Sequence, residues 1–241
     1  MMFRYVKTFL LCTCIGVSLE VFCQTKSVKC SYLATHCISD AIKNMEDVHI
    51  REMIIQKMQS DKKVYEMAYS DNIYFFSLAG GNADNDIKTV GQASCYYMDF
   101  GSDSLLIQRH ILDKAFLVVD TINHSLWAVS DERKVVNGIE CIKATTLTGS
   151  YSVAAWFSPE VAVPYGPLGY FGLPGLIVEL ETPTYTYTLQ DISYPTEKLC
   201  FTKPTTGKVV TQKEFDQLEA DNMKSRGNIT PGGVKVIRIG Q

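Results

Sequence analysis

A surplus of basic residues is the first thing that this sequence lacks. Its 241 residues include 23 Lys and Arg against 26 Asp and Glu, which gives a formal net charge of -3. Binding to a phosphate backbone needs a basic surface, so the balance of charge excludes nucleic acid as the main partner. Tryptophan is scarce, with two residues, whereas tyrosine and phenylalanine number 13 and 11. This aromatic content favours strands over a helical bundle.

Signatures of catalysis are also missing. The chain has no G-x-S-x-G elbow, and Glu179 and Glu181, two apart on one predicted strand, are typical of a solvated face. None of the four histidines lies in a Ser/His or Cys/His signature; they are His36, His49, His110 and His124. We therefore expect a protein without a cofactor that is not an enzyme. The alternative is an enzyme whose active site is assembled from distant residues.

Long apolar runs are absent beyond residues 1–23, so no transmembrane segment is expected in residues 24–241. Residues 1–23 have the pattern of a cleaved signal peptide. Arg4 and Lys7 precede the short apolar stretch Thr8–Phe22, and Cys23 ends the segment. A buried N-terminal strand is the alternative. The pattern predicts export, to the periplasm, to the outer membrane or to the outside of a Gram-negative bacterium.

Cysteine spacing in residues 24–241 fits an exported protein. There is no CxxC pair and no histidine at zinc-ligand spacing, so disulfides are favoured over a metal site. Five cysteines leave one unpaired and allow fifteen arrangements, and the short separation of Cys30 and Cys37 favours a local bridge between these two. The candidates are Cys30, Cys37, Cys95, Cys141 and Cys200.

Between residues 64 and 192 the chain consists of short β-type segments separated by turn residues. Tyr185, Tyr187 and Leu189 alternate with threonines, a period of two that predicts a half-buried strand pairing with Leu176–Glu181. Asn137-Gly138 is a strong hairpin signal. We predict a single, mainly β (α+β) domain over residues 24–241. Its core is a strongly curved antiparallel sheet or half-barrel, accompanied by one or two short helices.

Two segments outside this region predict helices. Ile38–Met58 carries apolar residues at nearly helical spacing, although part of it fits a strand equally well. If it is helical, Met45, His49 and Met53 stack on one face, where thioether and imidazole groups suit Cu(I) and plain core packing is the alternative. Thr211 and Glu214 have the spacing of a capping box, which predicts the start of a second helix.

One stretch of the sequence resembles a known family. Gly172-Leu173-Pro174-Gly175-Leu176-Ile177 matches the hexapeptide of the GLPGLI family, and upstream residues resemble other blocks of that family in the same order. Those blocks are Gly138, Cys141, Lys143 and Ala144, then Ala155-Trp156-Phe157, then Gly166-Pro167. The resemblance implies an exported, β-rich protein, and the family has no settled activity.

The hexapeptide permits two interpretations. In the first it is a structural corner, because Gly172 and Gly175 adopt angles closed to other residues, Pro174 fixes one torsion and Leu173 turns into the core. In the second, the aromatic residues beside it form an exposed apolar lip that binds a lipid or a partner. The candidate residues of the lip and motif are Trp156, Tyr165, Tyr170, Phe171, Gly172, Leu173, Pro174, Gly175, Leu176 and Ile177.

The functional expectation combines these observations. We expect an exported envelope protein whose concave sheet face binds an apolar ligand, a lipid or a peptide, or that binds another envelope protein. An unrecognised enzyme and a copper-handling protein are the alternatives.

Overall fold

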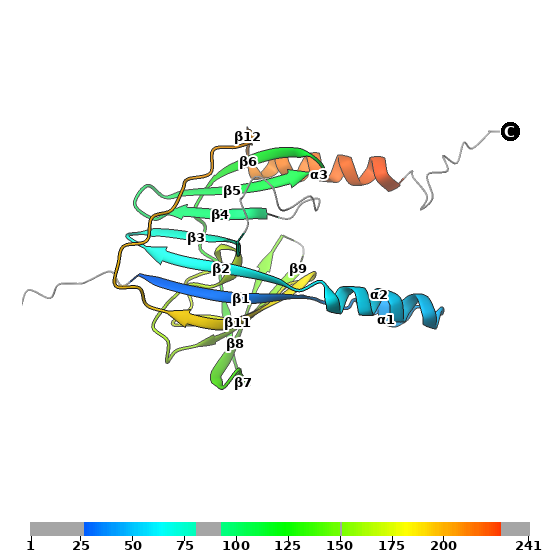
Figure 1. Ribbon diagram of the computed structural model, residues 1–241, viewed down its shortest axis with the longest axis horizontal. Helices are drawn as coiled ribbons and strands as arrows, with labels where there is room; N and C mark the ends of the chain where they lie inside the picture. Colours follow the sequence, from blue (N-terminus) through cyan, green and yellow to red (C-terminus); the bar gives the residue numbers. More distant parts are fainter. Residues whose placement is uncertain (1–26, 81–92, 150, 228–241) are drawn as a thin grey trace, which may run out of the picture.

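The computed structural model describes residues 27–80, 93–149 and 151–227. In these residues twelve strands form one sheet (Figure 1), in the order β12-β6-β5-β4-β3-β2-β1-β11-β10-β9-β8-β7. The strands are β1 (Val28–His36), β2 (Lys63–Ser70), β3 (Ile73–Leu78), β4 (Ala93–Asp99), β5 (Ser104–Ile111), β6 (Lys114–Thr121), β7 (Ala128–Val136), β8 (Ile139–Thr148), β9 (Tyr151–Ser158), β10 (Leu176–Glu181), β11 (Tyr185–Ser193) and β12 (Lys208–Val210).

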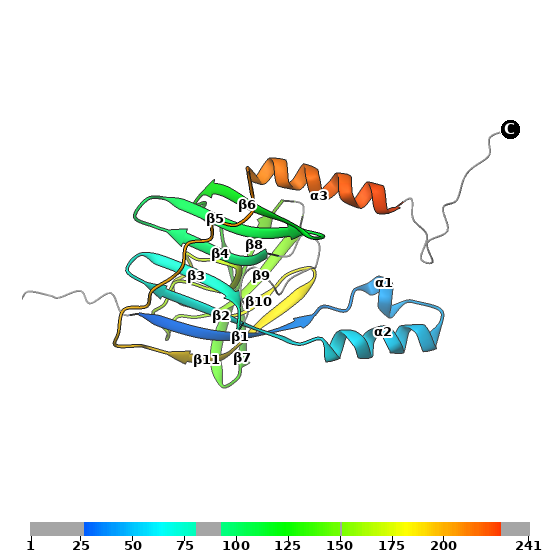
Figure 2. The same cartoon turned by 45° about the horizontal axis from the view of Figure 1, so that its top comes forward.

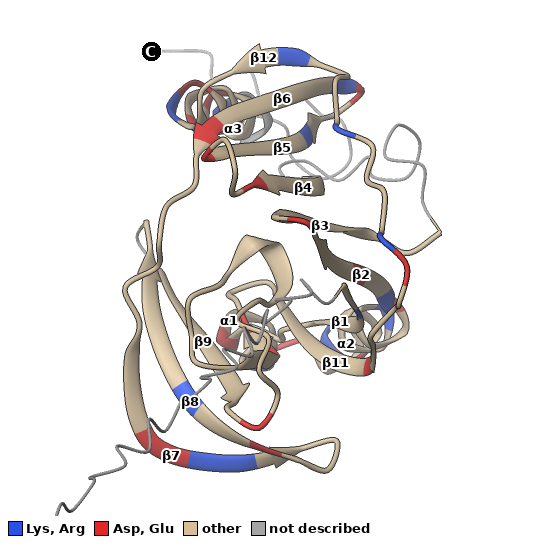
Figure 3. Cartoon of the chain, turned by 90° about the vertical axis from the view of Figure 1, so that its left-hand side faces the viewer, with Lys and Arg blue, Asp and Glu red and all other residues tan. Residues whose placement is uncertain are grey.

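The sheet is built almost wholly from antiparallel neighbours. Among the described strands only β12 pairs in parallel, with β6. Strand β1 joins the two halves of the sheet by pairing with β2 on one side and β11 on the other. The sheet stays open but curls strongly, with β12 and β6 at one end and β8 and β7 at the other (Figure 3). The prediction of a mainly β protein with a curved antiparallel sheet and few helices is confirmed.

The strands form where side chains alternate. Along β1 buried and half-buried residues alternate as period two requires, and β11 begins in the same way. The predicted pairing of β10 with β11 is present, with Leu180 opposite Tyr187. Asn137 and Gly138, with φ of 48° and 83°, make the predicted tight hairpin turn between β7 and β8.

The core lies on the concave face of the sheet. Large inward side chains from several strands are almost wholly buried, among them Tyr32, Tyr65, Tyr74, Phe76 and Tyr187. They pack against the segment of residues 159–175, which connects β9 to β10 and includes the 3-10 turn Pro167–Gly169. A second, smaller cluster lies beneath α3 (Gln212–Gly227), where Phe215 is 0% exposed.

The helical prediction for Ile38–Met58 is only partly right. Two helices form, α1 (Asp40–Lys43) and α2 (Val48–Ser60), with a break at residues 44–47. The break occurs because Asp47 caps α2: its Oδ1 accepts the amide hydrogen of Ile50 at 3.0 Å. This insertion between β1 and β2 extends away from the sheet (Figure 2).

The capping box at the start of α3 is confirmed. The Thr211 hydroxyl accepts the Glu214 amide hydrogen at 3.2 Å, and a Glu214 carboxylate oxygen accepts the Thr211 amide hydrogen at 2.7 Å. No helix among the described residues has both the length and the apolar character needed to cross a membrane. The predicted signal peptide, residues 1–23, lies outside the described residues.

Candidate functional site

The exposed apolar lip predicted beside the hexapeptide does not exist. Phe171 is 6% exposed and Leu173 is 2% exposed, and both belong to the main core. Tyr165 and Tyr170 are half-buried and pack against the same core. The prediction was wrong because residues 159–175 fold back onto the concave face of the sheet, where their aromatic side chains are part of the core.

Hydrogen bonds from buried aromatic side chains hold this segment in place. The Tyr74 hydroxyl donates to the Gly166 carbonyl at 2.6 Å and accepts the Gly169 amide hydrogen at 3.0 Å. The Tyr32 hydroxyl donates to the Ile177 carbonyl at 2.7 Å, and Trp127 donates through Nε1 to the Phe171 carbonyl at 3.0 Å. Each bond satisfies a backbone group that burial would otherwise leave unpaired.

These hydroxyls are structural groups, not acids or bases. Burial raises the pKa of Tyr32 and of Tyr74 well above the ordinary value. Burial likewise raises the pKa of Tyr170 to about 12. All three hydroxyls therefore keep their protons at neutral pH, and those of Tyr32 and Tyr74 donate to backbone carbonyls.

The hexapeptide is a corner, as the first interpretation held. Gly172 has φ of 91°, a region that disfavours side chains. Gly175 passes so close to β9 that an added Cβ would lie 2.0 Å from the Ser158 carbonyl oxygen. Leu176 and Ile177, both 0% exposed, then begin β10. The remaining motif residue, Pro174, lies between the two glycines.

Trp156, predicted as part of the lip, lies in a network of charged side chains. Its Nε1 donates to Glu181 at 2.8 Å, and the Lys134 ammonium lies 4.0 Å from the centre of its ring. Lys134 also pairs with Glu179 and, at 3.3 Å, with Glu181. Thr188 donates to Glu179 at 3.2 Å. The two glutamates were expected on a solvated face. Instead, both carboxylates contact side chains of neighbouring strands, and these contacts link β7, β9, β10 and β11.

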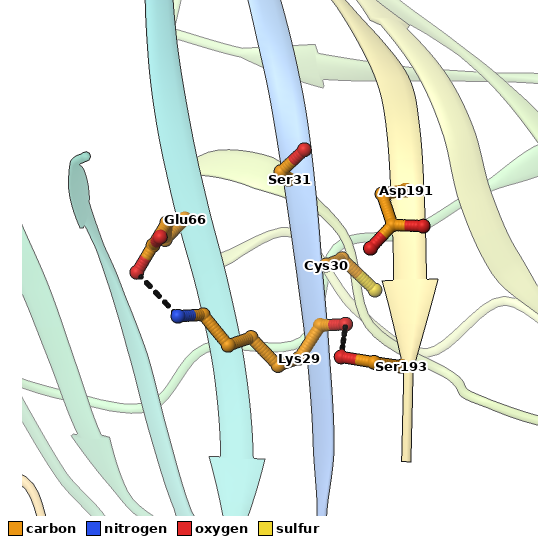
Figure 4. A pocket seen from close by; sticks show the side chains of 6 residues that line it. All are labelled: Lys29, Cys30, Ser31, Glu66, Asp191 and Ser193. Atoms are coloured by element: carbon orange, nitrogen blue, oxygen red, sulfur yellow. Dashed lines mark hydrogen bonds and ion pairs between the residues drawn. The ribbon is translucent and has the colours of Figure 1, made fainter. Parts of the chain in front are cut away.

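A small polar hollow of about 240 Å³ lies over β2, β1 and β11 (Figure 4). Lys29 and Glu66, 3.0 Å apart, form an ion pair at its rim. Burial, and secondarily Asp191, raises the pKa of the Cys30 thiol to about 12. The thiol is therefore protonated at neutral pH and a poor nucleophile, which argues against cysteine chemistry in this hollow.

The predicted disulfide between Cys30 and Cys37 is wrong. Both cysteines are free. Cys30 lies near the start of the extended strand β1, and Cys37 directly follows its last residue. Seven residues of strand place their Cα atoms roughly 23 Å apart, whereas a disulfide needs less than about 7 Å. The other candidates, Cys95, Cys141 and Cys200, form no disulfide with one another either.

The copper-binding interpretation also fails on geometry. Met45 lies in the break between the two helices, so it does not stack with His49 and Met53 on one helix face. Met53 is 63% exposed. Within the described residues no three His, Cys, Asp or Glu side chains gather in a way that could hold a metal ion.

One surface that lies outside the core is the insertion of residues 37–62, called the arm below. No residue of α1 or α2, both described in full, is buried. Val48, Ile50 and Met53 are 46%, 44% and 63% exposed. Ile50 and Met53, three residues apart, lie on the same side of α2 and are the apolar pair that a partner could contact there. Of these three, the sequence pattern singled out only Met53, and for metal binding.

The ends of the arm are anchored to the sheet. The Cys37 amide donates to the Thr184 carbonyl at 2.9 Å. His36 Nε2 lies 2.9 Å from Asp61 Oδ2, which joins the residue before the arm to the residue that ends α2. The arm therefore has a defined root, although its helices lie outside the core.

Comparison with known proteins adds a family match and a fold. A family model described as a protein of unknown function (Porph_ging) matches residues 146–179, which include the hexapeptide. No curated protein matches the chain. Two structures of PNGF-II, in C2 and P21 space groups, are similar over 82% of this chain, with TM-scores of 0.50 and 0.51 and 9% identity. The chain spans 33% and 34% of those chains, so the likeness concerns the fold.

Proposed function

We propose that this protein is an exported, non-enzymatic binding module that engages an envelope protein through its arm. One observation carries the proposal: the concave face of the sheet is filled by the protein's own residues 159–175, whereas the arm exposes Val48, Ile50 and Met53. We therefore place the partner's apolar contact on the arm, at Ile50 and Met53.

The filled interior argues against the expectation that a lipid or apolar peptide lies in the sheet. Tyr74 bonds to both Gly166 and Gly169, so a ligand would have to displace these bonds as well as the apolar contacts of Leu173. Each such hydrogen bond contributes about 1 kcal/mol to stability, and breaking it costs more when a buried group is left unpaired. The free energy of binding inside the sheet would therefore include a large unfavourable contribution from displacing residues 159–175.

Charge at the end of the arm favours a protein over a membrane. The break between α1 and α2 carries Glu46 and Asp47, both exposed, at the far end of the projection. Anionic head groups attract basic segments. Lys43 and Arg51 lie close to these carboxylates, so the end of the arm has no excess of basic charge that would draw it to an anionic bilayer. A protein groove with apolar floor and basic rim complements this surface.

Export is supported by the pattern of residues 1–23 and by the GLPGLI resemblance. Fractionation of the native organism, followed by amino-terminal sequencing, tests it directly. We expect a chain that starts at Gln24 in the envelope or medium. A cytosolic protein that keeps residues 1–23 would contradict the proposal.

Photo-crosslinking in the native organism tests the arm. We expect a crosslinkable residue at Ile50 to give one discrete adduct with another protein, and the same residue at the exposed Asp113 turn to give none. Replacing Val48 and Met53 by serine should abolish the adduct.

The matched control replaces Val209, an apolar residue 64% exposed on β12 and away from the arm, by serine. This variant should crosslink like the native chain. Equal adducts from Ile50 and Asp113, or an adduct with twice the mass of the chain, would contradict binding of a separate protein partner. Flotation with anionic phospholipid vesicles that depends on Ile50 would contradict the choice of protein over membrane.

A further inference from the structure

Strand β7 gives the sheet a long edge. Among the described strands β12 and β7 lie at the two ends of the sheet, and β12 has three residues whereas β7 has nine. One side of β7 pairs with β8, and no described strand lies beside its other side (Figure 3). Such an edge offers backbone amides and carbonyls to a further strand.

The charges on this edge follow a particular order. Two acidic residues are followed directly by two basic ones, in the order Asp131, Glu132, Arg133, Lys134. Figure 3 shows the two colours side by side on β7. Charges of one sign would repel a second copy of the same edge. This order does the opposite when two copies run antiparallel, because the acidic half of each strand then meets the basic half of the other.

Two of the four charges already have partners within the chain. Glu132 pairs with Lys143 at 2.9 Å, and Lys134 pairs with the glutamates of β10 described above. The other two, Asp131 and Arg133, are exposed, and neither forms an ion pair with another described residue. They are therefore available to a second molecule.

Exposed valines lie symmetrically on either side of these charges. Val129 and Val135 are 56% and 65% exposed, and each is three residues from Glu132. Their partners on β8 are Ala144 and Glu140, which are separated by an even number of residues, so both valines lie on the same face of the sheet. The edge therefore has an apolar residue at each end and opposite charges between them.

We propose that β7 is a homodimer interface, in which β7 of one copy lies antiparallel to β7 of a second copy about a two-fold axis at Glu132. In this register Asp131 of each copy lies opposite Arg133 of the other. Val129 of each copy likewise lies opposite Val135 of the other. Each contact occurs twice, because a two-fold interface uses the same surface on both copies. The two valines share a face, as opposed residues do in a sheet that continues across both copies.

The size of the contact determines how strong this dimer is. A single pair of edge strands buries less surface than the roughly 1,200–2,000 Å² of a stable interface. Pairing of β7 with β8 is also irregular between Val129 and Arg133, and such an irregularity bends an edge. We therefore expect a reversible dimer that forms as the concentration of the chain rises. A strand of another protein would need a matching order of charge, which a second copy of this chain already has.

Sedimentation velocity of the purified protein tests the interface through charge reversal. We expect the native chain to shift from monomer to dimer with rising concentration, and added salt to weaken the shift. Asp131→Arg places two basic residues opposite each other, and Arg133→Asp places two acidic residues there. Each variant alone should dimerise about tenfold more weakly than the native chain, because like charges directly opposite are destabilising. An equimolar mixture of the two variants restores both pairs of opposite charge and should dimerise like the native chain.

Asp113→Arg is the matched control, because Asp113 is exposed in the turn between β5 and β6, toward the other end of the sheet. This variant should dimerise like the native chain. A native chain that stays monomeric at every concentration would overturn the proposal. So would dimerisation that persists in both single variants, or a mixture that stays monomeric. The arm lies between β1 and β2, whereas β7 ends the sheet, so this result and the crosslinking result are independent.

Discussion

Removing the Tyr74 hydroxyl is the most direct test of how the segment of residues 159–175 is held. Tyr74→Phe leaves the ring in place but deletes a group that bonds the Gly166 carbonyl at 2.6 Å and the Gly169 amide at 3.0 Å. Tyr74 is 1% exposed, so water does not readily replace the lost partner. The variant therefore isolates the hydrogen bonds from the packing of the ring.

The expected loss follows from these two bonds. A buried donor or acceptor left unpaired costs about 1–3 kcal/mol. Two such groups give an expected loss of about 2–6 kcal/mol in the free energy of unfolding. For a domain of this size each 1 kcal/mol lowers Tm by about 2–4 °C.

Urea unfolding, followed by tryptophan fluorescence, measures this loss. Trp127 bonds to the same segment, so it reports on its release. Tyr151→Phe is the control, since Tyr151 is 49% exposed and its change should stay within about 0.5 kcal/mol. If Tyr74→Phe unfolds at the same urea concentration and with the same slope as the native chain, the hydroxyl does not hold the segment and the reasoning fails.

Three further predictions address the corner, a helix cap and the thiols. Gly175→Ala would place a Cβ 2.0 Å from the carbonyl oxygen of Ser158, so we expect a loss above about 3 kcal/mol in urea unfolding, or no folded protein; a native-like midpoint would disprove the close approach. Thr211→Ala removes the cap of α3 and should cost about 1 kcal/mol, whereas Thr211→Ser should restore most of it. With a thiol reagent at pH 8, the exposed Cys200 should react rapidly and the buried Cys30 only on unfolding; rapid reaction of Cys30 in the native protein would contradict its burial.

Strand positions could be predicted from the sequence because period-two alternation is a local property. Tyr185, Tyr187 and Leu189 alternate with polar residues over a few positions, and Asn137-Gly138 favours one turn type with little help from the rest of the chain. The capping box at Thr211 is equally local, since its two partners are three residues apart.

The candidate site was predicted less well, because exposure depends on what packs on top. Tyr170, Phe171 and Leu173 are apolar in either interpretation, and only the curl of the sheet shows that they fill its interior. Likewise, helical spacing gave Met45 and His49 one face, but the cap at Asp47 ended that continuity.

The sequence by itself determined the strands and the tight turns, since each depends on neighbours within a few residues. Only the tertiary structure decided that β1 pairs with both β2 and β11, that residues 159–175 occupy the concave face and that His36 meets Asp61. These contacts join residues far apart in the chain. Their energies come from burial and long-range pairing, which local composition does not encode.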